Sequence, residues 1–111
     1  MASTHPKLIE LPNPSGGTIV YFYCPGCKHG HGFEVPRWSF NRDFEKPTFS
    51  PSLLVFYTKP KTNERVTCCH LFLRNGILEF LGDCPHALKG TKVPLVDWPE
   101  DYHKPGDPSP A

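Results

Sequence analysis

Five cysteines and six histidines are the residues best suited to chemistry in this chain of 111 amino acids. Cys24 and Cys27 form a C-P-G-C motif, in which proline and glycine let the backbone fold so tightly that both sulfurs point at one ion. This spacing is typical of half of a tetrahedral zinc site. We predict that two later cysteines complete a closed, structural zinc site with the ligands Cys24, Cys27, Cys69 and Cys84.

The ligand set has alternatives. His31, His70 or His86 could replace one thiolate, because imidazole is also a zinc ligand. The cysteines could instead be buried thiols that pack as small hydrophobes. A thioredoxin-like redox motif is less favoured, since no βαβ pattern surrounds the C-x-x-C sequence. The odd number of cysteines and the lack of an apolar N-terminal signal core favour thiolates in a reducing cytosol over disulfides.

His70 and Asp83 are candidates for acid–base chemistry. A carboxylate that accepts one imidazole N–H fixes the tautomer and leaves the other nitrogen free as a general base. The segment P-T-F-S-P-S at residues 47–52 offers two hydroxyls in a proline-stiffened turn. We predict Ser52 as the nucleophile, His70 as its base and Asp83 as the orienting carboxylate, with nearby backbone N–H groups forming an oxyanion hole.

These residues also have other interpretations. Ser50 is the reserve nucleophile, and both serines could merely form hydrogen bonds within the turn, as serine beside proline commonly does. His70 could be a strand histidine without a catalytic role, or a zinc ligand. Cys68 is an alternative nucleophile, although two residues along a strand is a long reach to His70.

A β-hairpin over residues 66–86 must position the histidine, the carboxylate and two of the cysteines. Asn75-Gly76 stands between two apolar, β-prone runs and predicts a two-residue type I′ turn, because both turn residues need positive φ. The register then pairs Arg74 with Ile77 and His70 with Leu81. Side chains alternate between the two faces of the hairpin.

This alternation separates two kinds of chemistry. Cys69 and Cys84 fall on the face that carries the core leucines, at the open end of the hairpin. His70 and Asp83 fall on the opposite face as diagonal neighbours, close enough for side-chain contact. The hairpin therefore predicts a thiol pair for the fold and a His/carboxylate pair for catalysis.

The rest of the chain predicts a small, mainly β, zinc-stapled antiparallel fold with one short helical turn. Fourteen prolines and nine glycines argue against long helices. β-Branched and aromatic runs predict strands at residues 18–23, 33–35 and 52–57, with an edge segment at 91–98. Proline at 85 and glycine at 90 predict the helical turn. The expected divisions are an arm at 1–16, a zinc-binding β domain at 17–98 and a disordered proline-rich tail at 99–111.

Charge and hydropathy exclude some classes of function. The net charge is +1 and no basic run is present, so the sequence predicts no nucleic-acid partner. No stretch approaches the roughly 18 apolar residues that a membrane-spanning helix needs. We expect a soluble, cytoplasmic protein.

Several motifs together resemble a family of small proteins encoded by tailed phages, a domain of unknown function often labelled ammonia monooxygenase. The resemblance covers about residues 18–97, and the motifs are C-P-G-C at 24–27, W-x-F-N at 38–41, P-T-F-S-P-S-L-L at 47–54, C-H-x-F at 69–72, N-G-I at 75–77 and D-C-P-H-A-L-x-G at 83–90. The absence of a membrane span and of a histidine-rich copper site argues against the monooxygenase label.

The resemblance extends to proteins of bacterial ubiquitin-like conjugation operons that look like peptidases of the modifier. Their serine in a P-S motif and histidine in a C-x-x-H-F motif match Ser52 and His70. Their knuckle contains more cysteines than the single C-x-x-C present here. The resemblance thus implies a hydrolase of peptide or isopeptide bonds with a protein or peptide substrate, in the host cytoplasm if the protein is phage-encoded.

The competing hypothesis is a non-catalytic zinc module that binds a host protein. An exposed cluster of aromatic side chains at Trp38, Phe40, Phe44 and Phe49 would favour it. The sequence does not indicate the oligomeric state or the identity of the substrate.

Overall fold

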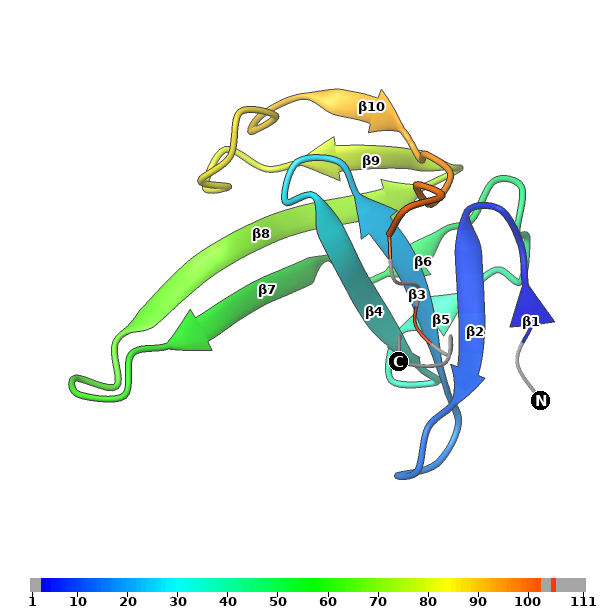
Figure 1. The fold of residues 1–111 in the computed structure, drawn as a ribbon, viewed down its shortest axis with the longest axis horizontal. Helices are drawn as coiled ribbons and strands as arrows, with labels where there is room; N and C mark the ends of the chain where they lie inside the picture. Colours follow the sequence, from blue (N-terminus) through cyan, green and yellow to red (C-terminus); the bar gives the residue numbers. More distant parts are fainter. Residues whose placement is uncertain (1–2, 103–104, 106–111) are drawn as a thin grey trace.

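The computed structural model describes residues 3–102 and residue 105, which form ten β-strands in three antiparallel sheets (Figure 1). The first sheet has the order β1-β2-β3-β4, with bounds Ser3–Thr4, Leu8–Pro12, Thr18–Cys24 and His29–Val35. The second has the order β10-β9-β8-β7, with bounds Lys92–Pro94, Ile77–Phe80, Arg65–Arg74 and Leu53–Thr58. The third pairs β5 (Ser39–Phe40) with β6 (Phe49–Ser50). The predicted mainly β fold is confirmed.

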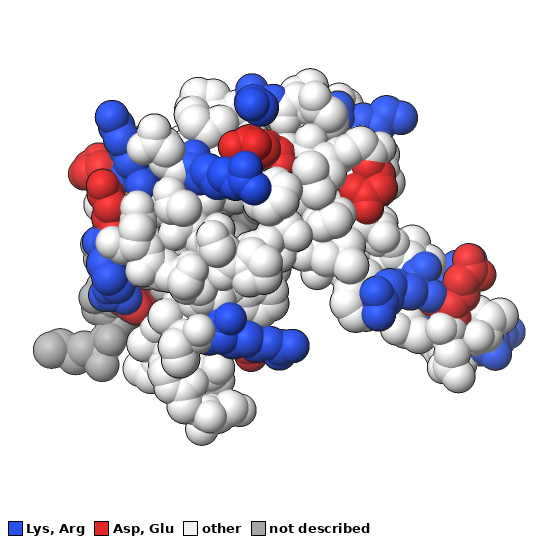
Figure 2. All heavy atoms as spheres, turned by 180° about the vertical axis from the view of Figure 1, so that it is seen from behind, with Lys and Arg blue, Asp and Glu red and all other residues white. Residues whose placement is uncertain are grey.

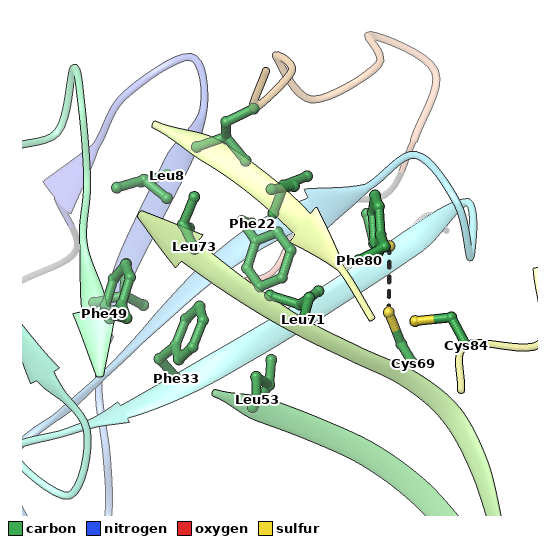
Figure 3. Close-up of a cluster of buried hydrophobic side chains, with 14 residues drawn as sticks. Leu8, Phe22, Phe33, Phe49, Leu53, Cys69, Leu71, Leu73, Phe80 and Cys84 are labelled. Carbon is green, nitrogen blue, oxygen red and sulfur yellow. Dashed lines mark hydrogen bonds between the residues drawn. The ribbon is translucent and has the colours of Figure 1, made fainter. Parts of the chain in front are cut away.

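The core lies where the two four-stranded sheets cover each other. Alternate residues of β3 and of β8 point inward, as expected for strands with one buried face. Figure 3 shows side chains from both sheets meeting in one cluster, with Cys69 and Cys84 at one end of it. The buried members from the two sheets and β6 are Leu8, Val20, Phe22, Cys24, Phe33, Phe49, Leu53, Cys69, Leu71, Leu73, Leu78 and Phe80.

The predicted hairpin turn is confirmed. Asn75 and Gly76 have φ values of 51° and 75°, as a type I′ turn requires. Arg74 pairs with Ile77, and the pairing continues inward as predicted. Beyond the end of β9, the N–H of Leu81 still donates to the carbonyl of His70 at 2.9 Å, so the register holds as far as the histidine.

The β7–β8 hairpin extends well beyond the rest of its sheet as a curved two-stranded arm (Figure 1). We call residues 56–67 the arm. The register between the two strands shifts between Val55 and Phe56, where Cys68 is the extra residue on β8. A β-bulge of this kind bends the ribbon and increases its twist. The sequence pattern of the two strands does not reveal the bulge.

The first sixteen residues differ from the expected arm or loop. Leu8–Pro12 is a strand paired with β3, and its first three residues are buried. Glu10 is one of them, and it accepts hydrogen bonds from Arg42 at 2.7 and 3.0 Å and from Thr18 at 2.8 Å. The bond from Arg42 is the main reason that the pKa of Glu10 is lowered. This ion pair compensates for burying a carboxylate in the strand.

The predicted helical turn at residues 85–90 is wrong. The described residues contain no helix, and this segment forms tight turns instead. The N–H of Leu88 donates to the Nδ1 atom of His86 at 3.2 Å, while the N–H of Lys89 donates to the carbonyl of His86 at 3.2 Å. A single helical turn fixes several dihedral angles for one hydrogen bond, so this local alternative prevails.

The predictions for the chain ends have different outcomes. The edge segment expected at 91–98 is confirmed for residues 92–94, where β10 pairs with β9 at the border of the second sheet. The proline-rich tail at 99–111 lies largely outside the described residues. In the part of the chain that is described, no helix is long and apolar enough to cross a membrane.

The four aromatic residues between 38 and 49 do not form an exposed cluster. Phe49 is fully buried, and its ring stacks on those of Phe33 and Phe40 with centroids 4.0 and 4.4 Å apart. Trp38, Phe40 and Phe44 are partly buried and pack against the core. The feature that would have favoured a non-catalytic binding module is therefore not found among these residues.

Candidate active site and metal centre

Ser52, His70 and Asp83 form one hydrogen-bonded chain. The Oγ atom of Ser52 lies 3.2 Å from the Nε2 atom of His70. The Nδ1 atom of His70 lies 3.0 and 3.2 Å from the two carboxylate oxygens of Asp83. Because a carboxylate only accepts, Nδ1 carries the proton and Nε2 is left to accept from the serine hydroxyl. The structure thus brings together the three residues that the sequence singled out.

Ser52 immediately precedes β7, and the segment before it is held from two sides. The hairpin turn donates the N–H of Asn75 to the Thr48 hydroxyl at 2.8 Å and the N–H of Gly76 to the Pro47 carbonyl at 2.9 Å. The indole N–H of Trp38 donates to the carbonyl of Ser52 at 3.3 Å. The Asn75-Gly76 turn of the β8–β9 hairpin therefore fixes the position of Ser52, which faces His70 on β8.

The histidine and the carboxylate lie on an open surface. Their side chains are 25% and 54% exposed, and Ser52 is half-buried. The main chain of His70 is held by Cys84, whose thiol donates to the His70 carbonyl at 3.0 Å and accepts from the His70 N–H at 3.1 Å. Cys84 directly follows Asp83, so the same contact also anchors the carboxylate.

The two alternative nucleophiles lie elsewhere. Ser50 is exposed in β6, where its carbonyl accepts from the Ser39 hydroxyl at 3.5 Å. Cys68 sits in the β-bulge, and its carbonyl lies 3.5 Å from the Cys27 sulfur. Among the hydroxyl and thiol groups of the described residues, the one that forms a hydrogen bond with a nitrogen of the His70 ring is that of Ser52.

A group of metal-ligand atoms lies on the other face of β8. The ligand atoms of Cys24, Cys27, His31 and Cys69 are all within 4.8 Å of one another. The β3–β4 hairpin supplies the first three, at C-x₂-C-x₃-H spacing, and β8 supplies Cys69. The Cys27 N–H lies 3.4 Å from the Cys24 sulfur, a contact that holds the knuckle closed.

His31 contributes an unsatisfied nitrogen to this group. The residue is only 6% exposed, and its Nε2 atom has no hydrogen-bond partner among the described residues. A buried imidazole nitrogen without a partner is costly, and a metal ion would satisfy it. The sequence marked His31 as an alternative ligand, and its place on the inward face of β4 is the signal that favours it.

The three thiols of this group perturb one another. The hydrogen bond with Cys69 is the main cause of a lowered pKa of Cys24, about 4. Burial is the main cause of the raised pKa of Cys27, about 12, and the pKa of Cys69 is raised through its hydrogen bond with Cys24. Because the pKa values of Cys27 and Cys69 are raised, all three groups would be thiolates only beside a compensating cation, and a bound metal ion would supply that charge.

Cys84 belongs to a second group, with Cys69 and His86, whose ligand atoms also lie within 4.8 Å of one another. The Nε2 atom of His86 is 3.5 Å from the Cys69 sulfur. The ring of His86 lies against Gly26 so closely that a Cβ atom there would be 2.3 Å from it, which explains the glycine of the C-P-G-C motif. The four predicted ligands are thus divided between two groups that share Cys69.

Comparison with known proteins gives one family. No curated protein and no solved structure matches the chain, so the relation to phage proteins stays a prediction. A family model described as bacterial ubiquitination-like system serine protease (BubE) matches residues 3–81, a range that includes Ser52 and His70 and ends just before Asp83. This match supports the predicted relation to peptidases of such operons. The chain belongs to the BubE family.

Proposed function

We propose that this protein is a serine-type hydrolase of peptide or isopeptide bonds. The observation that carries the proposal is the chain of hydrogen bonds from the Ser52 hydroxyl through His70 to Asp83. The description of the BubE family as a serine protease supports it independently. The family's printed link to a ubiquitination-like system favours a ubiquitin-like protein, or a conjugate of one, as the substrate.

The three side chains have separate roles in this mechanism. The Ser52 oxygen attacks the scissile carbonyl carbon while its proton passes to Nε2 of His70. His70 then gives that proton to the leaving amine as the carbon–nitrogen bond breaks, and an acyl group remains on Ser52. Water, deprotonated by His70, releases the acyl group. Asp83 keeps the imidazole in the required tautomer and stabilises its positive charge.

The oxyanion would be bound by main-chain donors at the turn before β7. Pro51 has no N–H, so at this position of the turn the N–H of Ser52 is the donor that we assign. The nucleophile's own N–H forms part of the oxyanion hole in known serine proteases, because it lies close to the reacting oxygen.

We further propose that Cys24, Cys27, His31 and Cys69 bind one structural zinc ion. Three sulfurs and one nitrogen are a common tetrahedral ligand set, and a zinc–sulfur bond of about 2.3 Å implies sulfurs roughly 3.8 Å apart. The sulfurs of Cys24 and Cys69 are 4.0 Å apart, which fits. His31 replaces Cys84 of the predicted set, since Cys84 is engaged with the main chain of His70. The ion would tie β3 and β4 to β8, next to His70.

The activity is tested by cleavage of a bacterial ubiquitin-like protein that carries a C-terminal peptide extension. The wild type is expected to release the extension, and Ser52→Ala to lower kcat by on the order of 10³-fold or more, because it removes the nucleophile. Ser50→Ala is the matched control, because this serine lies two residues away outside the triad, and it should keep wild-type activity. Full activity of Ser52→Ala, or loss of activity in Ser50→Ala, would contradict the assignment.

A further inference from the structure

β7 is the end strand of its sheet, and the nucleophile stands at its beginning. Strand order places β8 on one side of β7, and no strand of the described residues pairs with the other side. Ser52 directly precedes the first residue of the strand, Leu53. An open strand edge therefore runs away from the candidate active site.

The main-chain groups that face this edge can be identified from the hydrogen bonds of His70. Its carbonyl accepts from Leu81 and its N–H donates to Cys84, so both groups point away from β7. His70 is paired with Leu54, and in such an antiparallel pair the groups of both residues point outward. The N–H and carbonyl of Leu54 therefore face the free edge, and those of Phe56 follow by alternation.

The direction of the Ser52 carbonyl supports the assignment of the outward main-chain groups. It lies two residues before Leu54 and therefore points to the same side, where it accepts from the Trp38 indole, a group outside the sheet. The outward groups of Leu54 and Phe56 lie about 7 and 13 Å further along the strand, given a rise of roughly 3.3 Å per residue.

Side chains add an apolar element to the same path. Leu54 and Phe56 lie on the sheet face that carries Ser52 and His70, because alternate residues share a face. Phe56 is 45% exposed, and the guanidinium of Arg65 lies over its ring at 4.2 Å from the centroid. Tyr57, 53% exposed, points to the opposite face.

We propose that the free edge of β7 binds an extended segment of the polypeptide substrate, which adds a strand to the sheet and leads its scissile bond to Ser52. This inference rests on the proposed hydrolase function. The main chain of Leu54 and Phe56 supplies the hydrogen bonds of β-augmentation, and the Phe56 ring contacts an apolar side chain of the substrate. The arm stands clear of the body, with charged side chains of both signs near its tip (Figure 2), which leaves room for a chain beside it.

The test uses fluorescein-labelled casein as an unfolded polypeptide and a fluorophosphonate as a small probe of Ser52. Phe56→Ala should raise the KM for casein roughly tenfold, because the apolar contact is lost. Tyr57→Ala is the matched control, an equally exposed aromatic on the next residue but on the other face, and it should leave KM unchanged. Phe56→Pro removes an outward N–H without removing a sheet hydrogen bond and should weaken casein binding further, by roughly fivefold relative to Phe56→Ala.

Labelling by the fluorophosphonate distinguishes a failure of edge docking from a failure of the proposed hydrolase function. All three variants should label Ser52 at the wild-type rate, because the probe does not reach the arm. If Ser52 is labelled but the Phe56→Ala and Tyr57→Ala variants have the same KM for casein, edge docking is overturned and the hydrolase is not. If Ser52 of the wild type is not labelled at all, the proposed function itself fails.

Discussion

At the scale of single residues, the site depends on two pairs of neighbours in the sequence. Cys69 precedes His70, and Cys84 follows Asp83. In β8 adjacent residues point to opposite faces, so Cys69 lies in the core and His70 at the surface. Asp83 and Cys84 follow the end of β9 and show the same division, with Cys84 buried and Asp83 exposed. The thiol of Cys84 reaches back to the main chain of His70 and joins the two pairs. The buried sulfurs thus hold His70 and Asp83 in register on the opposite face.

Substitution of one residue in each group tests which of the two metal-ligand groups binds zinc. His31→Ala should weaken zinc binding by more than roughly 100-fold, because even residues that only hydrogen-bond to ligands account for about 10- to 100-fold. Cys84→Ala, the comparison variant, should leave the affinity unchanged. Competition with a chromophoric chelator measures zinc affinity, and cobalt(II) spectra report the number of thiolates. The reverse result, zinc lost in Cys84→Ala and kept in His31→Ala, would restore the set of four thiolates.

The sequence predicts the proximity of Ser52, His70 and Asp83 more readily than it predicts the place of His31 among the metal-ligand atoms. Ser52, His70 and Asp83 follow from local patterns, namely a proline-stiffened turn and a hairpin whose register is set by two residues. His31 depends on the length of β4, which begins at His29 rather than at Phe33 as expected. Glycines at 30 and 32 conceal this strand, because they lower its β propensity.

At the scale of elements, the Asn75-Gly76 turn does more than close its hairpin. Its N–H groups hold the segment at 47–48, which leads to Ser52, and the carbonyl of Gly76 accepts from Leu95 at 2.9 Å. The turn is therefore a junction between the strand that carries His70 and the segment that carries Ser52. Weakening it should affect both stability and the alignment of the triad.

Two glycine substitutions test this role. Gly76→Ala should lower the free energy of unfolding by about 1–2 kcal/mol, because φ is 75° and the new Cβ would lie 3.2 Å from the Cα of Lys46. Gly82→Ala, where a Cβ would meet nothing within 4 Å, should change it by less than about 0.5 kcal/mol. Urea unfolding measures both. Equal effects of the two changes would mean that the turn does not have this role.

Elements whose form depends on distant partners were harder to predict. β2 is formed by pairing with β3, and its buried Glu10 carboxylate is compensated by Arg42, 32 residues away. The bulge at Cys68 has no signal in the pattern of β7 and β8, and it sets the direction of the arm. By contrast, the I′ turn and β3 were predicted correctly, since each depends on residues within the element itself.

At the scale of the whole molecule, the ligand group joins the two four-stranded sheets. Cys24, Cys27 and His31 belong to the first sheet and its turn, and Cys69 to the second. A small core gains from such a staple, because the free energy of metal binding adds to that of folding. Ser52, His70 and Asp83 lie on the outer face of the second sheet, so the ion would support this face without being exposed on it.

The most direct test of the central claim is the mass of the intact, zinc-loaded protein after reaction with a fluorophosphonate, followed by peptide mapping. One adduct is expected, located on Ser52, which is absent from Ser52→Ala and formed far more slowly in His70→Ala. The adduct should be unchanged in Ser50→Ala. A folded wild-type protein that gains no adduct, or gains one at another residue, would contradict a serine hydrolase built on Ser52, His70 and Asp83.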